Sequence, residues 1–119
     1  MPEILQIGED EGLLHTRSAV LNSAGLNTVD CVVADFNDCR PEEPFQVAVL
    51  CHSIARGKRR GLGEAIRARW PSIRVLQMDK LFVFASDNGE HADMTIAAGE
   101  PSRVISAVRQ LLSEKASAG

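Results

Sequence analysis

The chain has 119 residues, of which 45% are apolar and 24% are charged. This composition is typical of one folded domain and unlike that of disordered or collagen-like chains. The net charge of −3 argues against a nucleic-acid-binding module. No apolar run approaches the roughly 18 residues of a membrane span, and no basic-plus-apolar signal peptide opens the chain. Three cysteines without a CxxC pair favour a reducing cytoplasm over a disulfide scaffold. We therefore expect a single cytoplasmic domain over residues 1–119.

A short apolar run at residues 4–7 predicts a buried strand that stops at Gly8. Apolar residues then recur at helical spacing between residues 13 and 24, which predicts a helix. Asp10 or Glu11 lies near the start of this helix, and Gly25 falls where a left-handed C-terminal cap would lie.

Two further strands are predicted before residue 52. Residues 28–33 are rich in β-branched side chains and predict the second strand. Residues 34–45 contain two prolines and several Asp and Asn residues, so any helix there is short or irregular. Residues 45–51 are nearly all apolar without alternation, as in a central strand that is covered on both faces.

The second half of the chain continues the alternation of helices and strands. Residues 61–70 carry an apolar helical stripe, and residues 73–78 predict a shorter strand near an edge. Residues 92–97 give a weaker strand pattern, and a helix is predicted from Pro101 to about Glu114. The remaining tail, residues 113–119, is small and polar and is expected to fray.

This alternation predicts an α/β fold with a flavodoxin-like, doubly wound, five-stranded parallel sheet. The second and fourth crossovers are short, because only about twelve residues separate strands two and three and residues 79–91 separate strands four and five. A ligand site in such a sheet lies at the carboxyl ends of the strands, beside the switch point between strands one and three. Three segments would meet there: residues 8–10, residues 51–53, and Asp79 with Lys80.

Over nearly its whole length the chain resembles a response-regulator receiver domain. The run Ile4-Leu5-Gln6-Ile7-Gly8-Glu9-Asp10 resembles the apolar first strand of receivers and the acidic pair that ends it. The run Gln46-Val47-Ala48-Val49-Leu50-Cys51 is similar to their third strand, whose last residue is normally the phospho-accepting aspartate. Ala92-Asp93 resembles the Gly-Ala-Asp that precedes their fifth strand.

The departures from this pattern bear on function. Cys51 stands where the resemblance places the acceptor aspartate, and Gly8 replaces one acid of the pair, leaving Glu9 with Asp10 as a helper. Asp79 lies near the hydroxyl residue that receivers use to sense the phosphoryl group. Residues 97–101 contain no counterpart of the lysine that follows the fifth strand. The resemblance therefore implies a degenerate receiver, or pseudo-receiver, that is not phosphorylated in the usual way.

No cofactor is expected. Magnesium prefers several hard oxygen ligands, so Glu9 and Asp10 alone are weak candidates for a metal site. They could equally stabilise the first helix through its dipole. The three histidines, at positions 15, 52 and 91, lack the spacing of zinc ligands.

Two segments are candidates for a partner surface. The net charge hides a division, since residues 1–45 have a balance of −7 and residues 46–80 a balance of +6. The basic excess centres on Arg56, Lys58, Arg59 and Arg60, which would suit an acidic partner or phosphate, or simply a solvated loop and outer helix face. Phe82 and Phe84 lie in an unusually apolar stretch that either joins a partner or completes the core.

The leading hypothesis is a stand-alone, non-enzymatic signalling module of the two-component, or phosphorelay, type. It would act by contact with a protein partner such as a sensor kinase, another regulator or a second copy of itself. A second hypothesis is a small thiol-dependent or ligand-sensing protein that uses the strand-end crevice around Cys51, lined also by Glu9 and Asp79. Phosphorylation on another acid, such as Asp10 or Asp79, is a third alternative.

Overall fold

The computed structural model describes residues 3–34, 45–51, 54, 56–79, 93–97 and 101–118. The predictions about the two short crossovers and about His52, Lys80, Phe82 and Phe84 lie outside these residues.

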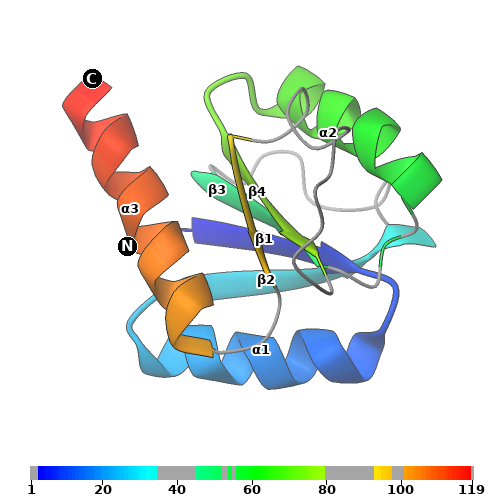
Figure 1. Ribbon diagram of the computed structural model, residues 1–119, viewed down its shortest axis with the longest axis horizontal. Helices are drawn as coiled ribbons and strands as arrows, with labels where there is room; N and C mark the ends of the chain where they lie inside the picture. The colour runs from blue at the N-terminus through cyan, green and yellow to red at the C-terminus, as the bar shows by residue number, and fades with distance from the viewer. Residues whose placement is uncertain are drawn as a thin grey trace.

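Five parallel strands form one sheet, which confirms the predicted fold class (Figure 1). The strands are β1 (Glu3–Gly8), β2 (Asn27–Val32), β3 (Val47–Leu50), β4 (Arg74–Asp79) and β5 (Met94–Ala97). They lie in the order β2-β1-β3-β4-β5, and every neighbouring pair is parallel. The first crossover therefore runs outward from β1 to β2 and the later ones run the other way. This reversal creates a switch point between β1 and β3, as doubly wound sheets do.

Helices cover both faces of the sheet. The helices are α1 (Glu11–Ser23), α2 (Arg56–Arg69) and α3 (Pro101–Ala118). Figure 1 shows α1 below the sheet and α2 above it, and α3 lies at the left of the view. Buried residues of α1 and α3 share one apolar cluster with one face of the sheet, and buried residues of α2 pack in a second cluster on the other face.

The alternation of side chains along the strands explains the two clusters. In β1, Ile4 belongs to the cluster under α1 and α3, whereas Leu5 and Ile7 belong to the cluster under α2. All four residues of β3 are buried, as predicted for a central strand covered on both faces.

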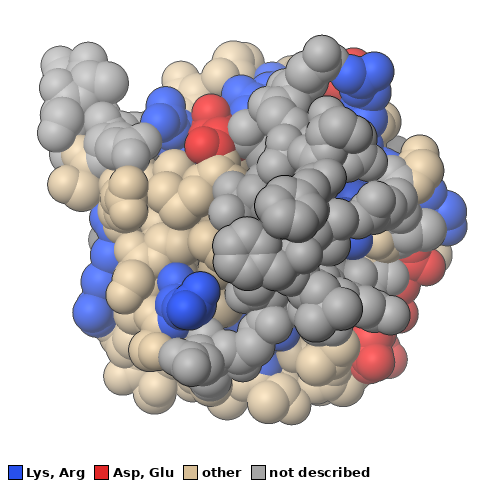
Figure 2. Space-filling model, viewed as in Figure 1, with Lys and Arg blue, Asp and Glu red and all other residues tan. Residues whose placement is uncertain are grey.

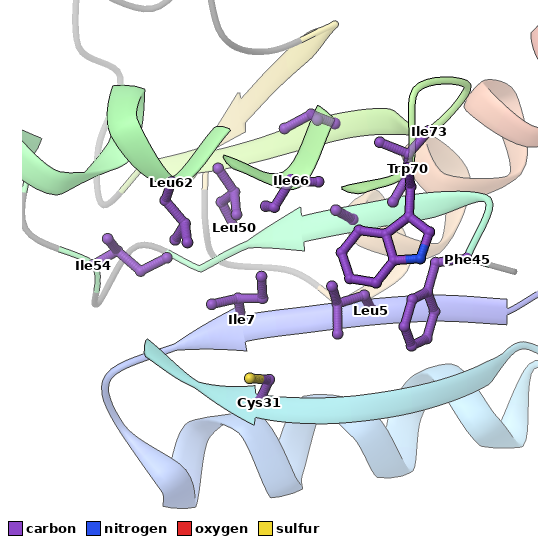
Figure 3. Close-up of a cluster of buried hydrophobic side chains, with 12 residues drawn as sticks. Leu5, Ile7, Cys31, Phe45, Leu50, Ile54, Leu62, Ile66, Trp70 and Ile73 are labelled. Carbon is purple, nitrogen blue, oxygen red and sulfur yellow. The ribbon is translucent and has the colours of Figure 1, made fainter. Parts of the chain in front are cut away.

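The α2 side of the core is built around an aromatic pair. Trp70 and Phe45 meet edge to face, with their ring centroids 5.2 Å apart (Figure 3). Leu62 and Ile66 of α2 point into the same cluster, which confirms the apolar stripe expected over residues 61–70. This packing fixes α2 over the sheet.

Two helices extend beyond their predicted bounds. The helix expected to begin at Gly61 begins at Arg56, so the basic segment forms the first turns of α2 and not a loop. The dipole disfavours cations at a helix N-terminus, and glycines weaken a helix, which is why the sequence pattern missed these turns. The last helix, α3, continues to Ala118, through most of the tail expected to fray, since that tail contains helix-forming Ala and Lys.

Asp93 ties the start of β5 to the rest of the sheet. Its Oδ2 accepts a hydrogen bond from the backbone N–H of Val75 at 2.7 Å and another from Arg67 Nη2 at 3.0 Å. The strand expected from residue 92 begins at Met94, directly after this anchor. Among the described helices, none is long and apolar enough to cross a membrane.

Candidate functional site at the carboxyl edge of the sheet

The predicted site residues gather at one edge of the sheet. Gly8 ends β1 and Asp79 ends β4, while Glu9 and Asp10 follow β1 directly. Cys51 follows β3, and its backbone N–H donates a hydrogen bond to the carbonyl of Ile7 at 2.9 Å. This edge is the carboxyl edge of the sheet, where the sequence predicted the site.

Cys51 lies inside the protein, under α1. It is fully buried. Val47 and Val49 point into the cluster under α1 and α3, so the alternation along β3 places Cys51 on the same face. Arg17 of α1 confirms this placement, because its Nη1 donates a hydrogen bond to Cys51 Sγ at 3.3 Å.

Burial controls the protonation of this thiol. Burial raises the pKa of Cys51, and the nearby Arg17 guanidinium opposes that effect without overcoming it. The thiol therefore stays neutral at physiological pH. A neutral, buried thiol is a poor nucleophile, and such a cysteine usually behaves as a small apolar side chain.

Gly8 is the neighbour of Cys51 on β1. It is buried and pairs with Val32 across the β1–β2 ladder. The β1–β3 ladder pairs Ile7 with Leu50, so the next residues, Gly8 and Cys51, lie side by side. Since glycine has no side chain, this position offers neither a carboxylate nor any bulk between α1 and the sheet.

The two acids that follow β1 already have protein partners. Asp10 is the N-cap of α1, and its Oδ1 accepts a hydrogen bond from the N–H of Leu13 at 3.2 Å. Glu9 Oε2 lies 3.9 Å from Lys58 Nζ on α2. Within the described part of the chain, no group of three His, Cys, Asp or Glu side chains is placed to hold a metal ion.

A buried polar cluster lies beside this site and was not singled out from the sequence. Gln6 is fully buried, and its Nε2 donates hydrogen bonds to the carbonyl of Leu14 at 3.0 Å and to Asp30 Oδ1 at 2.9 Å. His15 Nδ1 lies 3.8 Å from the other oxygen of Asp30. The only signal in the sequence was a polar residue inside each of two apolar strands. The cluster joins β1 and β2 to α1 close to Arg17.

The basic segment of α2 splits into inward and outward side chains. Lys58 and Arg60 are exposed, and Lys and Arg side chains border the molecule where α2 lies (Figure 2). Arg59 is only 9% exposed, and its Nε donates a hydrogen bond to the carbonyl of Ile54 at 3.1 Å. This burial disfavours Arg59 as a member of a partner surface, since helical periodicity turns it away from its exposed neighbours Lys58 and Arg60.

The other cysteine that the structure describes lies on the opposite face. Cys31 of β2 belongs to the cluster under α2, as Figure 3 shows, whereas Cys51 faces α1. Both are free thiols. The sheet separates them.

Comparison with known proteins finds solved structures with the same fold as this chain. No family model and no curated protein matches the sequence. Among solved structures, a CheY-like receiver domain protein from Methanospirillum hungatei JF-1 is 16% identical with a TM-score of 0.80, over 100% of this chain and 99% of that chain. A response regulator from Thermotoga maritima is 13% identical with a TM-score of 0.78, over 95% and 98% of the two chains.

A third similar structure is the beryllofluoride-activated receiver domain of DrrB. It is 21% identical, with a TM-score of 0.76 over 95% of this chain and 98% of that chain. The three alignments span almost the full length of both partners, so the likeness covers the whole sheet and not a shared fragment. The chain has the CheY-like fold of response-regulator receiver domains.

Proposed function

We propose that this chain is a receiver-like signalling module that works without aspartyl phosphorylation. The observation that carries the proposal is the environment of Cys51, a buried neutral thiol that accepts a hydrogen bond from Arg17 at the end of β3. In the receiver resemblance this position holds the carboxylate that receives the phosphoryl group. A thiol cannot form an acyl phosphate.

The surrounding residues support the same conclusion. Gly8 contributes no carboxylate, and Asp10 and Glu9 are engaged by the first turn of α1 and by Lys58. Phosphorylation of Asp10 would remove the charge-assisted cap from α1, so that alternative is not favoured. Asp79 ends β4, two residues past the position that pairs with Leu50, and it remains a weaker alternative acceptor.

Incubation of the purified chain with acetyl phosphate and magnesium tests this part of the proposal. Intact-mass measurement should show no added phosphoryl group, while a phosphorylatable receiver domain treated in the same tube becomes modified. Stoichiometric modification of this chain would refute the proposal, and peptide mapping would then identify the acid that was modified.

The module would act on a protein partner in the cytoplasm, such as a sensor kinase, another regulator or a second copy of the chain. The exposed basic side chains at the start of α2, Lys58 and Arg60, suit an acidic surface on that partner. Arg56, Phe82 and Phe84 remain proposed members of the same surface. The free thiols of Cys31 and Cys51 are consistent with a reducing compartment.

Charge reversal tests the partner surface. Binding to sensor kinases and receivers from the same genome is measured for the wild type and for the double variant Lys58→Glu/Arg60→Glu. The double variant should bind at least about tenfold more weakly, with a smaller dependence on salt. Reversal of Arg103 and Arg109, two exposed residues of α3, is the matched control. Equal loss in both double variants would argue against the α2 surface.

The thiol-dependent alternative is disfavoured by the burial of Cys51 and the direction of its pKa shift. Alkylation under native conditions separates the two functions. A structural thiol at Cys51 should react as slowly as Cys31, whereas a functional thiol would react much faster. Loss of a partner-free activity in Cys51→Ser would favour the thiol-dependent protein.

A further inference from the structure

The receiver resemblance implies a divalent metal at the carboxyl edge, and the residues present do not fit one. A magnesium site needs several oxygen ligands. Here Gly8 has no side chain, Cys51 presents a neutral thiol, and Asp10 is committed to the cap of α1. The side chain that does reach this position is a cation, Arg17.

We propose that the guanidinium of Arg17 takes the place of the metal ion and excludes divalent cations from the carboxyl edge. This inference deepens the proposed function and rests on it, since it names the residue that keeps the site from accepting metal. Arg17 thereby acts as a specificity-determining residue of the edge.

The direction of side chains on α1 and the pairing of β1 with β3 explain why Arg17 reaches Cys51. Side chains of an α-helix point back toward its N-terminus, which for α1 is the end next to the carboxyl edge of the sheet. Gly8 follows Ile7 as Cys51 follows Leu50, and it places no side chain between α1 and the sheet. The Arg17 side chain ends with Nη1 3.3 Å from Cys51 Sγ.

The electrostatics favour exclusion of a cation. A guanidinium stays charged at every physiological pH, and Arg17 is half-buried, where charges are less screened than at the surface. Among the described residues, no carboxylate lies within ion-pair distance of Arg17. The Asp30 carboxylate also acts on the Cys51 thiol and offsets part of this charge, but the group in direct contact with Cys51 is the guanidinium.

Restoring the carboxylate at position 51 provides the test. In Cys51→Asp, the new carboxylate should pair with Arg17 and not with metal. In Cys51→Asp/Arg17→Met the carboxylate is freed, and the competing cation is gone. Titration with Mn²⁺, followed as paramagnetic broadening of amide signals near Gly8 and position 51, should show affinity at least about tenfold higher in the double variant.

A matched control uses Arg109, whose Nη2 donates a hydrogen bond to the carbonyl of Ala24 at the other end of α1. Cys51→Asp/Arg109→Met loses the same charge and should bind Mn²⁺ no better than Cys51→Asp. Equal Mn²⁺ affinity with and without Arg17 would overturn the inference, as would an equal gain in the Arg109 control.

A stability measurement covers the case in which the double variant folds poorly. Urea unfolding should show Cys51→Asp to be folded in the absence of metal, because Arg17 neutralises its carboxylate. Cys51→Asp/Arg17→Met should have a lower urea midpoint that magnesium restores. If Cys51→Asp itself depends on magnesium, Arg17 does not replace the metal. The wild-type acetyl phosphate experiment tests the proposed function separately.

Discussion

At the scale of single residues, Cys51 links the fold to the proposed function. Its position at the end of β3 was predicted from the apolar pattern, but its neighbours were not. Arg17 is thirty-four residues away in the sequence, and only the packing of α1 on the sheet brings the two side chains together. The hydrophobic pattern of a segment predicts which face of the sheet or helix a residue occupies. It does not predict which side chain of another element the residue contacts.

The raised pKa of Cys51 predicts a stability that declines in alkaline solution. Above about pH 8.5 the thiol ionises in the unfolded chain but keeps its proton in the folded chain, so rising pH favours unfolding. The loss attributable to this one group is at most about 1.4 kcal/mol per pH unit. Urea unfolding of the wild type and of Cys51→Ser at pH 8 and pH 10 measures it.

The wild type should lose more free energy of unfolding between these pH values than Cys51→Ser does. Other titrating groups are common to both proteins and cancel in the comparison. Parallel pH profiles would mean that Cys51 ionises as easily in the folded chain as in the unfolded one.

Gln6 and Asp30 are polar residues whose contacts could not be predicted from the sequence. Each interrupts an apolar strand, which indicates an unusual environment without showing what the side chain contacts. The structure shows that Gln6 bridges α1 and β2. A buried polar residue needs a partner, but the sequence does not say which one.

At the scale of helices and strands, the sequence predicts the elements well where hydrophobic period and caps agree. Helix α1 is the best example, since Asp10 caps its start and Gly25 adopts a φ of 86° just after its end. Helix α2 is the exception. Its first turns are held by the buried Arg59 and by tertiary packing, which the charge pattern does not reveal.

Removing the N-cap of α1 should destabilise the protein. In Asp10→Ala the N–H of Leu13 loses its acceptor, and the free energy of unfolding should fall by about 1 kcal/mol. Asp10→Asn preserves a cap and should remain close to the wild type in urea unfolding. A wild-type midpoint for Asp10→Ala would exclude a structural role for this carboxylate.

Two glycines should respond to alanine in opposite directions. Gly25 has a positive φ, so Gly25→Ala should lower the free energy of unfolding by about 1 kcal/mol although no atom lies in the way. Gly61 lies within α2, is exposed and has open space around it, so Gly61→Ala should raise that free energy by about 0.5–1 kcal/mol. Thermal unfolding of both variants checks this, and changes of the same sign would contradict it.

At the scale of the whole molecule, the fold persists although the sequence diverges. The three solved receivers described above share only 13% to 21% of their residues with this chain at TM-scores of 0.76 to 0.80. Apolar strands that alternate with amphipathic helices predict this fold class, and many sequences satisfy that pattern. The residues at the carboxyl edge are under no such constraint, so the fold was predictable and the function required the individual side chains.

Several basic residues of the chain lie on α2, which begins next to the carboxyl edge of the sheet. Lys58 of the basic α2 reaches toward Glu9, which joins the two sides of the carboxyl edge across the switch point. The other exposed cation at the start of α2, Arg60, extends the same basic face. The molecule thus presents basic side chains beside the carboxyl edge of the sheet.

Beryllofluoride binding distinguishes a receiver that is phosphorylated on aspartate from one that is not, because this ion forms a stable mimic of an aspartyl phosphate and needs both a carboxylate and magnesium. Amide NMR spectra of the isotope-labelled chain are recorded before and after addition of beryllofluoride and magnesium. We expect unchanged signals for Gly8, Glu9, Cys51 and Asp79, because the proposed module forms no aspartyl phosphate. A second set of signals at these positions, populated stoichiometrically, would contradict it.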